Sequence, residues 1–188
     1  YDEGIEEKLD RDKAYYEHMK MMYEKYEENH EVAAFYALSV LGASPERDAE
    51  TYGKGAIVVK GILAENPTHP GALHYLIHSY DDPDHAHLAL DAANSYSKVA
   101  ADAGHALHMP SHIYVALGMW DEVISSNIAS YNASDERRKR LELAPDTRNY
   151  HALEWLMYGY LQKGNQDTAR VLLDSMFSYM DEKPSPRA

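Results

Sequence analysis

The sequence contains no cysteine among its 188 residues. Disulfide bonds, thiolate metal sites and cysteine nucleophiles are therefore excluded, and cysteine usage says nothing about the redox compartment. The sequence also lacks any apolar run near the roughly 18 to 20 residues that a membrane-spanning helix needs. Its first dozen residues are charged and do not read as a signal peptide. We therefore expect a soluble protein with no membrane span.

Basic residues are in the minority, with 18 lysines and arginines against 31 acidic residues and a formal charge of −13. No basic stripe interrupts this excess, which repels nucleic acid and anionic membranes. The charge favours peptides, small molecules or cations as partners, and no nucleic acid. At 45% hydrophobic residues, the chain is long enough for one domain with a sizeable core.

Strand-like alternation is also missing, whereas apolar residues recur at steps of three and four along most of the chain. This periodicity predicts an all-α fold in which helices alternate with short turns. Asp84 is the expected N-cap of the fifth helix. The predicted helices span residues 10–26, 31–41, 47–65, 70–80, 85–99, 104–117, 121–143, 149–162 and 166–180.

A repeat with an offset of 34 residues joins two of these helices. Ala72-Leu73-His74 is followed by His78 and Tyr80, and Ala106-Leu107-His108 is followed by His112 and Tyr114. A third copy, His151-Ala152-Leu153-Glu154 with Tyr160, begins 46 residues after His105 because about twelve residues are added in the preceding helix. A fixed period in this range indicates a solenoid of helix-turn-helix units.

These units resemble the tetratricopeptide repeat over residues 30 to 180. The resemblance includes a tyrosine late in the first helix, a glycine at the turn and a small residue where the helices cross. The turn and crossing positions are occupied by Gly118 and Gly164, and by Ala89, Val123 and Ala169. The segments HPGALHYLIHSYDDPDHA and HALHMPSHIYVALGMWD are similar to a functionally uncharacterised bacterial group of such proteins.

The resemblance implies a tetratricopeptide-like helical-hairpin solenoid, an α-α superhelix, over residues 30–181. Residues 1–29 are expected to form an N-terminal helix that ends a truncated upstream repeat, and residues 182–188 a flexible tail. Because the chain begins at Tyr1 rather than methionine, we expect an upstream domain that this chain lacks. The compartment, bacterial cytoplasm or periplasm, stays open.

In tetratricopeptide arrays the first helix of each unit lines a concave groove. The residues at matching positions here are His74, His78, His105, His108, His112, His151, Glu154 and Tyr158. At 3.6 residues per turn, His105, His108 and His112 lie within about 60° on one helical face. The first functional hypothesis is therefore a scaffold that binds a peptide, a protein partner or a small ligand in a histidine-lined groove.

The second hypothesis is a divalent metal such as zinc, because histidine and carboxylate are its usual ligands and pairs spaced by four present two of them. The expected ligands are His74, His78, His108 and His112, with Glu154 or Asp81 as a further ligand or as the base of a metal-dependent hydrolase. No HExxH motif is present, so whether the protein is an enzyme stays open and no catalytic residue is assigned. Two other interpretations stay open. The histidines could be core residues whose hydrogen bonds are made within the protein, or the domain could have a purely structural role in a larger protein.

Two further features bear on this cluster. Pro110 removes a helical hydrogen bond and clashes with the carbonyl of Ala106, which predicts a kink between His108 and His112 and a freed backbone carbonyl. Clustered imidazoles are expected to titrate near neutrality, so groove binding should weaken or reverse sign between about pH 7.5 and 5.5.

The run from Asp81 to His85, together with His87, is a separate feature. Its carboxylates and imidazoles could bind a hard cation, or the run could form an ordinary turn.

Overall fold

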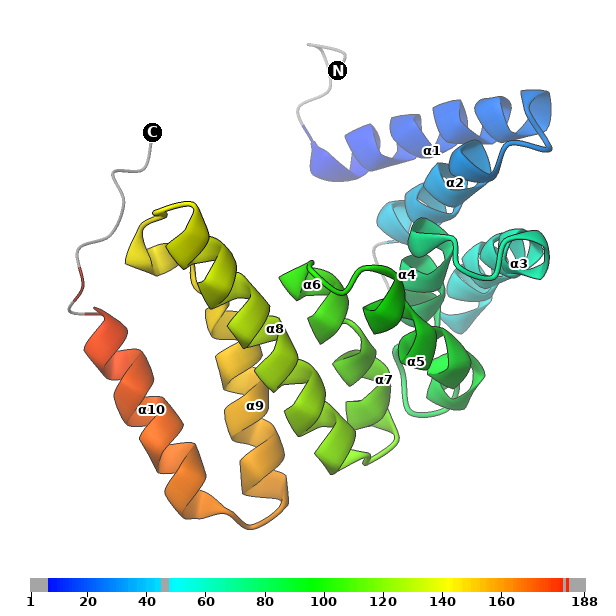
Figure 1. The fold of residues 1–188 in the computed structure, drawn as a ribbon. Helices are drawn as coiled ribbons and strands as arrows, with labels where there is room; N and C mark the ends of the chain where they lie inside the picture. The colour runs from blue at the N-terminus through cyan, green and yellow to red at the C-terminus, as the bar shows by residue number, and fades with distance from the viewer. Residues whose placement is uncertain (1–6, 45–47, 181, 183–188) are drawn as a thin grey trace. The chain divides into compact units, whose positions relative to one another are not determined.

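The structure, a computed structural model, describes residues 7–44, 48–180 and 182. These residues are helical with connecting turns and contain no strand, which confirms the all-α prediction (Figure 1). Helix boundaries lie within a few residues of the predicted ones, although Arg47, the expected start of the third helix, falls outside the described residues. The elements are α1 Lys8–Lys25, α2 His30–Ala43, α3 Ala49–Glu65, α4 Pro70–Ser79, η1 Ala86–Ala89, α5 Leu90–Val99, α6 Gly104–His108, α7 Pro110–Ala116, α8 Trp120–Arg140, η2 Pro145–Thr147, α9 Tyr150–Gln162 and α10 Gln166–Met180.

The chain forms two compact units, residues 1–95 and residues 96–188. Unit 1 contains α1 to α4, unit 2 contains α6 to α10, and α5 crosses the boundary between them. The predicted solenoid over residues 30–181, with its flanking segments, stays a prediction, and residues 183–188 of the expected tail lie outside the described part. None of the described helices combines the length and apolarity that a bilayer span requires.

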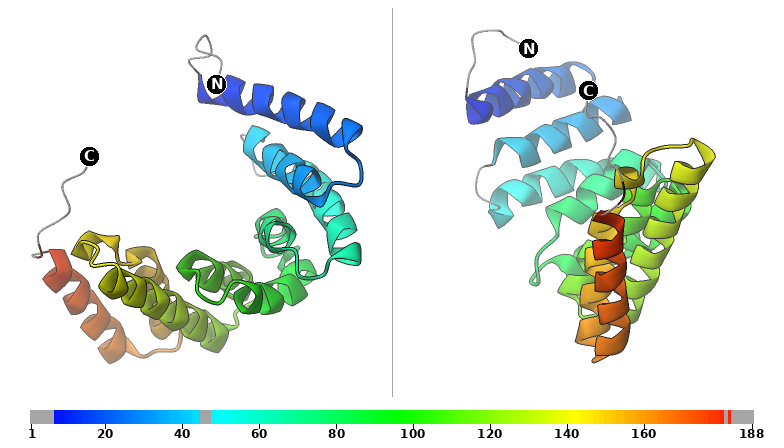
Figure 2. Two further views of the ribbon diagram at one scale, coloured as in Figure 1. Left: turned by 45° about the horizontal axis from the view of Figure 1, so that its top comes forward. Right: turned by 90° about the vertical axis from the view of Figure 1, so that its left-hand side faces the viewer.

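In unit 1 each helix packs on the next, with α1 on α2, α2 on α3 and α3 on α4 (Figure 2). The contact surfaces are rich in small side chains, and Ala37, Ala56 and Ala72 are completely buried. Such residues let helix axes approach closely, so larger neighbours such as Val59 and Ile77 complete a dense core.

In unit 2, α6 and α7 pack on α8, α8 on α9 and α9 on α10. The last three helices lie side by side in Figure 1. Gly159 marks a close crossing, because a Cβ there would lie 3.0 Å from Cγ1 of Ile124. The equivalent small residues of the repeat are all buried in the two units, namely Ala72, Ala89, Ala106, Val123, Ala152 and Ala169. The sequence repeat is therefore also a repeat in burial.

Helix starts are stabilised by side chains that accept a hydrogen bond from the backbone N–H three residues ahead. Asn29, Asp48 and Asn149 do this with side-chain oxygens. His69 does it with Nδ1, which accepts from the N–H of Ala72 at 3.2 Å. The expected N-cap Asp84 is not used, and His85 is the N-cap residue of η1. The carboxylate of Asp82 accepts from the backbone N–H of Asp84 and His85 in the preceding turn.

The capping role of His69 makes a testable prediction. Replacing it with alanine should lower the free energy of unfolding by about 1 kcal/mol or more, whereas His69→Asn should retain most of the stability because asparagine is a preferred N-cap. Chemical denaturation of both variants measures the difference. Equal losses in the two variants would contradict a capping role.

Two glycines give a second, matched prediction. Gly164 has φ +73°, a conformation that is unfavourable for residues with a Cβ, whereas Gly61 lies inside α3. A Cβ would meet no atom within 4 Å at either position, so only backbone effects differ. We expect Gly164→Ala to cost about 1 kcal/mol and Gly61→Ala to stabilise by about 0.5 to 1 kcal/mol in thermal or urea unfolding. A stabilising Gly164→Ala would contradict the left-handed turn.

Candidate metal centre

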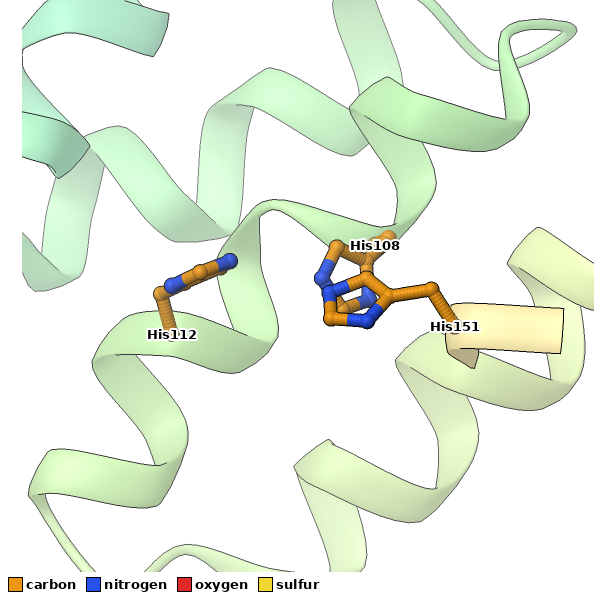
Figure 3. Close-up of side chains that lie close together, drawn as sticks. All are labelled: His108, His112 and His151. Carbon is orange, nitrogen blue, oxygen red and sulfur yellow. The ribbon is translucent and has the colours of Figure 1, made fainter. Parts of the chain in front are cut away.

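Three histidines of unit 2 converge from three helices, His108 at the end of α6, His112 in α7 and His151 in the first turn of α9 (Figure 3). One ring nitrogen of each lies within 4.8 Å of the others. The ring centroids of His108 and His151 are 4.6 Å apart, and those of His108 and His112 are 5.1 Å apart. Among the described residues, His108, His112 and His151 form the group of potential metal ligands whose nitrogens all lie this close together.

Pro110 interrupts the helix at this site, where a kink was predicted. The segment expected as one helix over residues 104–117 is two, because α6 ends at His108 and α7 begins at Pro110. Serine hydroxyls satisfy the carbonyls around the break. Ser126 donates to the carbonyl of Leu107 at 2.5 Å, and Ser111 donates to that of His108 at 2.6 Å. These bonds involve the carbonyls beside the break. The carbonyl that loses its helical donor at Pro110 is that of Ala106, and its binding of a ligand stays a prediction.

His108 is buried and held in one orientation by Asn127. The amide nitrogen of Asn127 donates to the carbonyl of Val123 at 2.8 Å, which leaves its Oδ1 as the acceptor. This oxygen lies 2.7 Å from Nδ1 of His108, so Nδ1 carries the proton and donates it. Nε2 of His108 is then an unprotonated nitrogen, and it is buried with no hydrogen-bond partner among the described residues.

Burial also keeps His108 uncharged. It lowers the pKa of His108 to about 4, with the nearby His112, His151 and His105 adding to the decrease and the hydrogen bond to Asn127 opposing it. His105 keeps a large exposed surface, yet partial desolvation of its ring lowers its pKa, and His112 and His151 lower it further. The expectation that the clustered imidazoles titrate near neutrality is therefore wrong for His108. This imidazole stays neutral across the range from pH 7.5 to 5.5.

Trp155 of α9 closes one side of the cluster. Its ring lies against all three imidazoles, with centroid separations of 5.0 Å to His108, 4.6 Å to His112 and 5.6 Å to His151. Glu154 lies beside the cluster, and its Oε2 is 3.8 Å from Nδ1 of His151. The side chains of His151 and Glu154 are 57% and 60% exposed, so solvent reaches the site from this side.

The three nitrogens are close enough to hold one ion after small side-chain movements. A tetrahedral zinc ion with Zn–N bonds of 2.0–2.1 Å places its ligand nitrogens about 3.3 Å apart. The nitrogens of the three histidines, which are up to 4.8 Å apart, therefore have to approach one another by about 1.5 Å. His151 is exposed and His112 is half-buried, so their rings can rotate toward the fixed Nε2 of His108.

The other predicted site residues lie in several places. His74 and His78 are neighbours in α4 of unit 1, with their Nε2 atoms 3.1 Å apart. Asp81 borders a cavity of about 300 Å³ in unit 1 that His78, Asp82, Asp84 and His85 also line. In unit 2, His105 is exposed, and Tyr158 packs edge-on against Trp120 at 5.8 Å.

Of the four expected metal ligands, the structure therefore groups His108 and His112 with His151, and His74 with His78. The groove containing all eight predicted residues stays a prediction.

Asn127 and Trp155 take part in the site but were not predicted from the sequence. The spacing of Asn127 could have identified it as buried. It lies four residues after Val123 and three before Ser130, and all three side chains are on a buried face of α8. A polar residue at such a position needs a buried partner. The sequence alone does not identify that partner as His108.

No protein-family model matches the chain, and no curated protein matches it either.

Proposed function

We propose that the protein binds a divalent transition-metal ion, with zinc as the best match, through His108, His112 and His151. The observation that carries this proposal is the buried Nε2 of His108, which is neutral, oriented by Asn127 and without a hydrogen-bond partner in the described residues. An unpaired buried acceptor is costly unless something binds it. An ion between the three rings would satisfy this nitrogen.

The surroundings of the cluster resemble the support that protein metal sites need. A metal-bound histidine usually donates its second ring N–H to a fixed acceptor, and Asn127 is placed to be that acceptor for His108. Glu154 is near enough to play the same part for Nδ1 of His151 once the ring turns to bind through Nε2. Three nitrogen ligands leave the fourth position of a tetrahedral zinc for water or for a donor atom of another molecule.

A zinc titration tests this proposal. We expect calorimetry of the purified chain to show one equivalent of zinc bound, and elemental analysis to agree. The double variant His112→Ala/His151→Ala should lose this binding, because a single histidine is a poor zinc ligand. His87→Ala changes an exposed histidine of η1 and serves as the control.

Circular dichroism should show that all three proteins keep their helical content. Absence of zinc binding, or unchanged binding in a folded double variant, would refute the proposal.

A repeat scaffold is the second candidate function. We infer that the hairpins form a tetratricopeptide-like solenoid, supported by the burial of the equivalent small residues and by positive φ at both turn glycines, Gly118 and Gly164. An exposed face of α9 with His151, Glu154 and Tyr158 is the surface on which a peptide would bind. Phage-displayed peptides that bind the protein but not Glu154→Ala/Tyr158→Ala would support this function, whereas recovery of no such peptides would count against it.

A further inference from the structure

The two histidines of α4 form a compact pair on one continuous helix. His74 and His78 are one turn apart, and their Nε2 atoms are separated by 3.1 Å. The ring centroids are farther apart, at 4.8 Å, so the two rings approach each other through their Nε2 edges. Both side chains are half-buried, and the ring of Tyr75 stacks on His74 at 5.4 Å, which limits the movement of that ring.

This separation is the one that a single metal ion imposes on two nitrogen ligands. With metal–nitrogen bonds of 2.0–2.1 Å, neighbouring ligands are about 2.9 Å apart at a square-planar or octahedral ion and about 3.3 Å apart at a tetrahedral one. The observed 3.1 Å falls between these values. One helical turn of α4 places the two rings side by side, and the hydrogen bond between them already holds both nitrogens near chelating distance. The rings must turn so that both Nε2 lone pairs point at one ion.

The equivalent pair of the next repeat shows what keeps this geometry. His108 and His112 occupy the same positions 34 residues later, but Pro110 stands where α4 has Leu76. The proline splits that helix, and the rings of His108 and His112 lie nearly perpendicular, at 82°. In α4 the helix is continuous, the angle between the rings is 42°, and the two nitrogens face each other.

We propose that His74 and His78 form a second metal site, a two-nitrogen chelate for a late divalent transition-metal ion that binds Cu²⁺ most tightly. Nitrogen donors favour copper over nickel and zinc in the ordinary order of divalent affinities. Without metal, one Nε2–H donates to the other Nε2. The ion takes the place of this proton, which moves to Nδ1 of the same ring, and water completes the coordination. This site lies in unit 1 and does not depend on the three-histidine site of unit 2.

Copper titration of the His112→Ala/His151→Ala chain tests the proposal in isolation, because that background lacks two ligands of the other site. We expect one Cu²⁺ to bind with an electron paramagnetic resonance spectrum typical of nitrogen ligation. His74→Ala, His78→Ala and the double change should each weaken binding by a similar factor of about ten or more, since either single change destroys the chelate. His87→Ala in the same background should bind like its parent.

If the losses of Cu²⁺ affinity in the two single variants add up to the loss in the double variant, the histidines act independently and the chelate is overturned. Unchanged Cu²⁺ binding in the double variant would overturn it as well. The result is separable from the zinc proposal. Zinc binding by the original chain tests His108, His112 and His151, whereas copper binding in the altered background tests His74 and His78.

Discussion

Replacing Asn127 with leucine is expected to lower the zinc affinity of the three-histidine site by about 10- to 100-fold, although all three histidines remain in place. Leucine has a similar size but cannot accept the proton of Nδ1 of His108, which Asn127 now accepts at 2.7 Å. The imidazole then loses the hydrogen bond that keeps Nε2 unprotonated and aimed at the cluster. Asn127 acts on the ion only through His108, so it is a positioning residue.

The same substitution should lower the free energy of unfolding by about 1 to 3 kcal/mol, because a buried N–H is left without an acceptor. The control is Asn127→Asp, which keeps an oxygen acceptor for Nδ1 and adds a charge that attracts a cation. We expect it to retain or raise zinc affinity. Calorimetric zinc titration and urea unfolding without metal measure the two effects separately. Zinc affinity that is equal in the folded Asn127→Leu variant and the original protein would rule out the positioning role.

Replacing Arg148 with methionine is expected to destabilise unit 2 by about 2 to 3 kcal/mol at pH 7. The side chain of Arg148 is 9% exposed and joins two carboxylates. Its Nη1 and Nη2 donate to Glu182 at 2.9 and 3.2 Å, and its Nε lies 3.5 Å from Oδ1 of Asp135. The guanidinium also stacks on Tyr179, 4.2 Å from the ring centroid. Methionine fills much of this space but leaves Glu182 without this cation and Asp135 with only Arg138 and Lys139.

The loss should depend on pH in a defined direction. Burial alone would raise the pKa of Asp135, but hydrogen bonds from Lys139 and Arg138 and their positive charges lower it below its ordinary value. A carboxyl with a lowered folded-state pKa stabilises the fold above its unfolded pKa of about 3.9 and loses this contribution as the pH falls through the folded value. Nε of Arg148 lies 3.5 Å from the same carboxylate, so protonation of Asp135 also removes this ion pair. The difference between the original protein and Arg148→Met should for this reason shrink below about pH 4.

Urea unfolding at pH 7 and pH 3 measures this difference. Lys163→Met is the matched control, because Lys163 pairs with Asp121 on an exposed surface and should cost about 0.5 kcal/mol or less. Equal losses from the two variants at pH 7 would contradict a special role for the buried arginine. A loss at Arg148 that is the same at both pH values would show that packing, and not charge, is responsible.

The positions of the helices were readable from local sequence features. Apolar spacing predicted the helices of both units to within a few residues, and Pro110 predicted the break that separates α6 from α7. Capping was less predictable, since Asp84 was expected as an N-cap, whereas His85 is the N-cap residue of η1 and Asp82 accepts the N–H groups of the preceding turn. Several residues of one turn can offer a similar oxygen, and which one reaches the backbone N–H depends on the exact path of the loop.

The composition of the candidate metal site could be predicted only in part. The repeat drew attention to His108 and His112, which belong to the cluster, and it included His151 among the groove residues but not among the metal ligands. The ligand roles depend on contacts between segments distant in the chain, such as the hydrogen bond between His108 and Asn127, 19 residues apart. Helical periodicity gives the direction of a side chain on its own helix, but not which side chain it meets on another.

The all-α fold, the approximate helix positions and the interruption at Pro110 therefore follow from the order of residues, because each depends on interactions within a few positions along the chain. The repeat is visible directly in the sequence. The convergence of His108, His112 and His151, the orientation of His108 by Asn127 and the burial that lowers its pKa to about 4 arise only when α6, α7, α8 and α9 pack together. Burial and through-space distance are properties of that packing, and they make one histidine of a repeated pair a fixed, neutral imidazole.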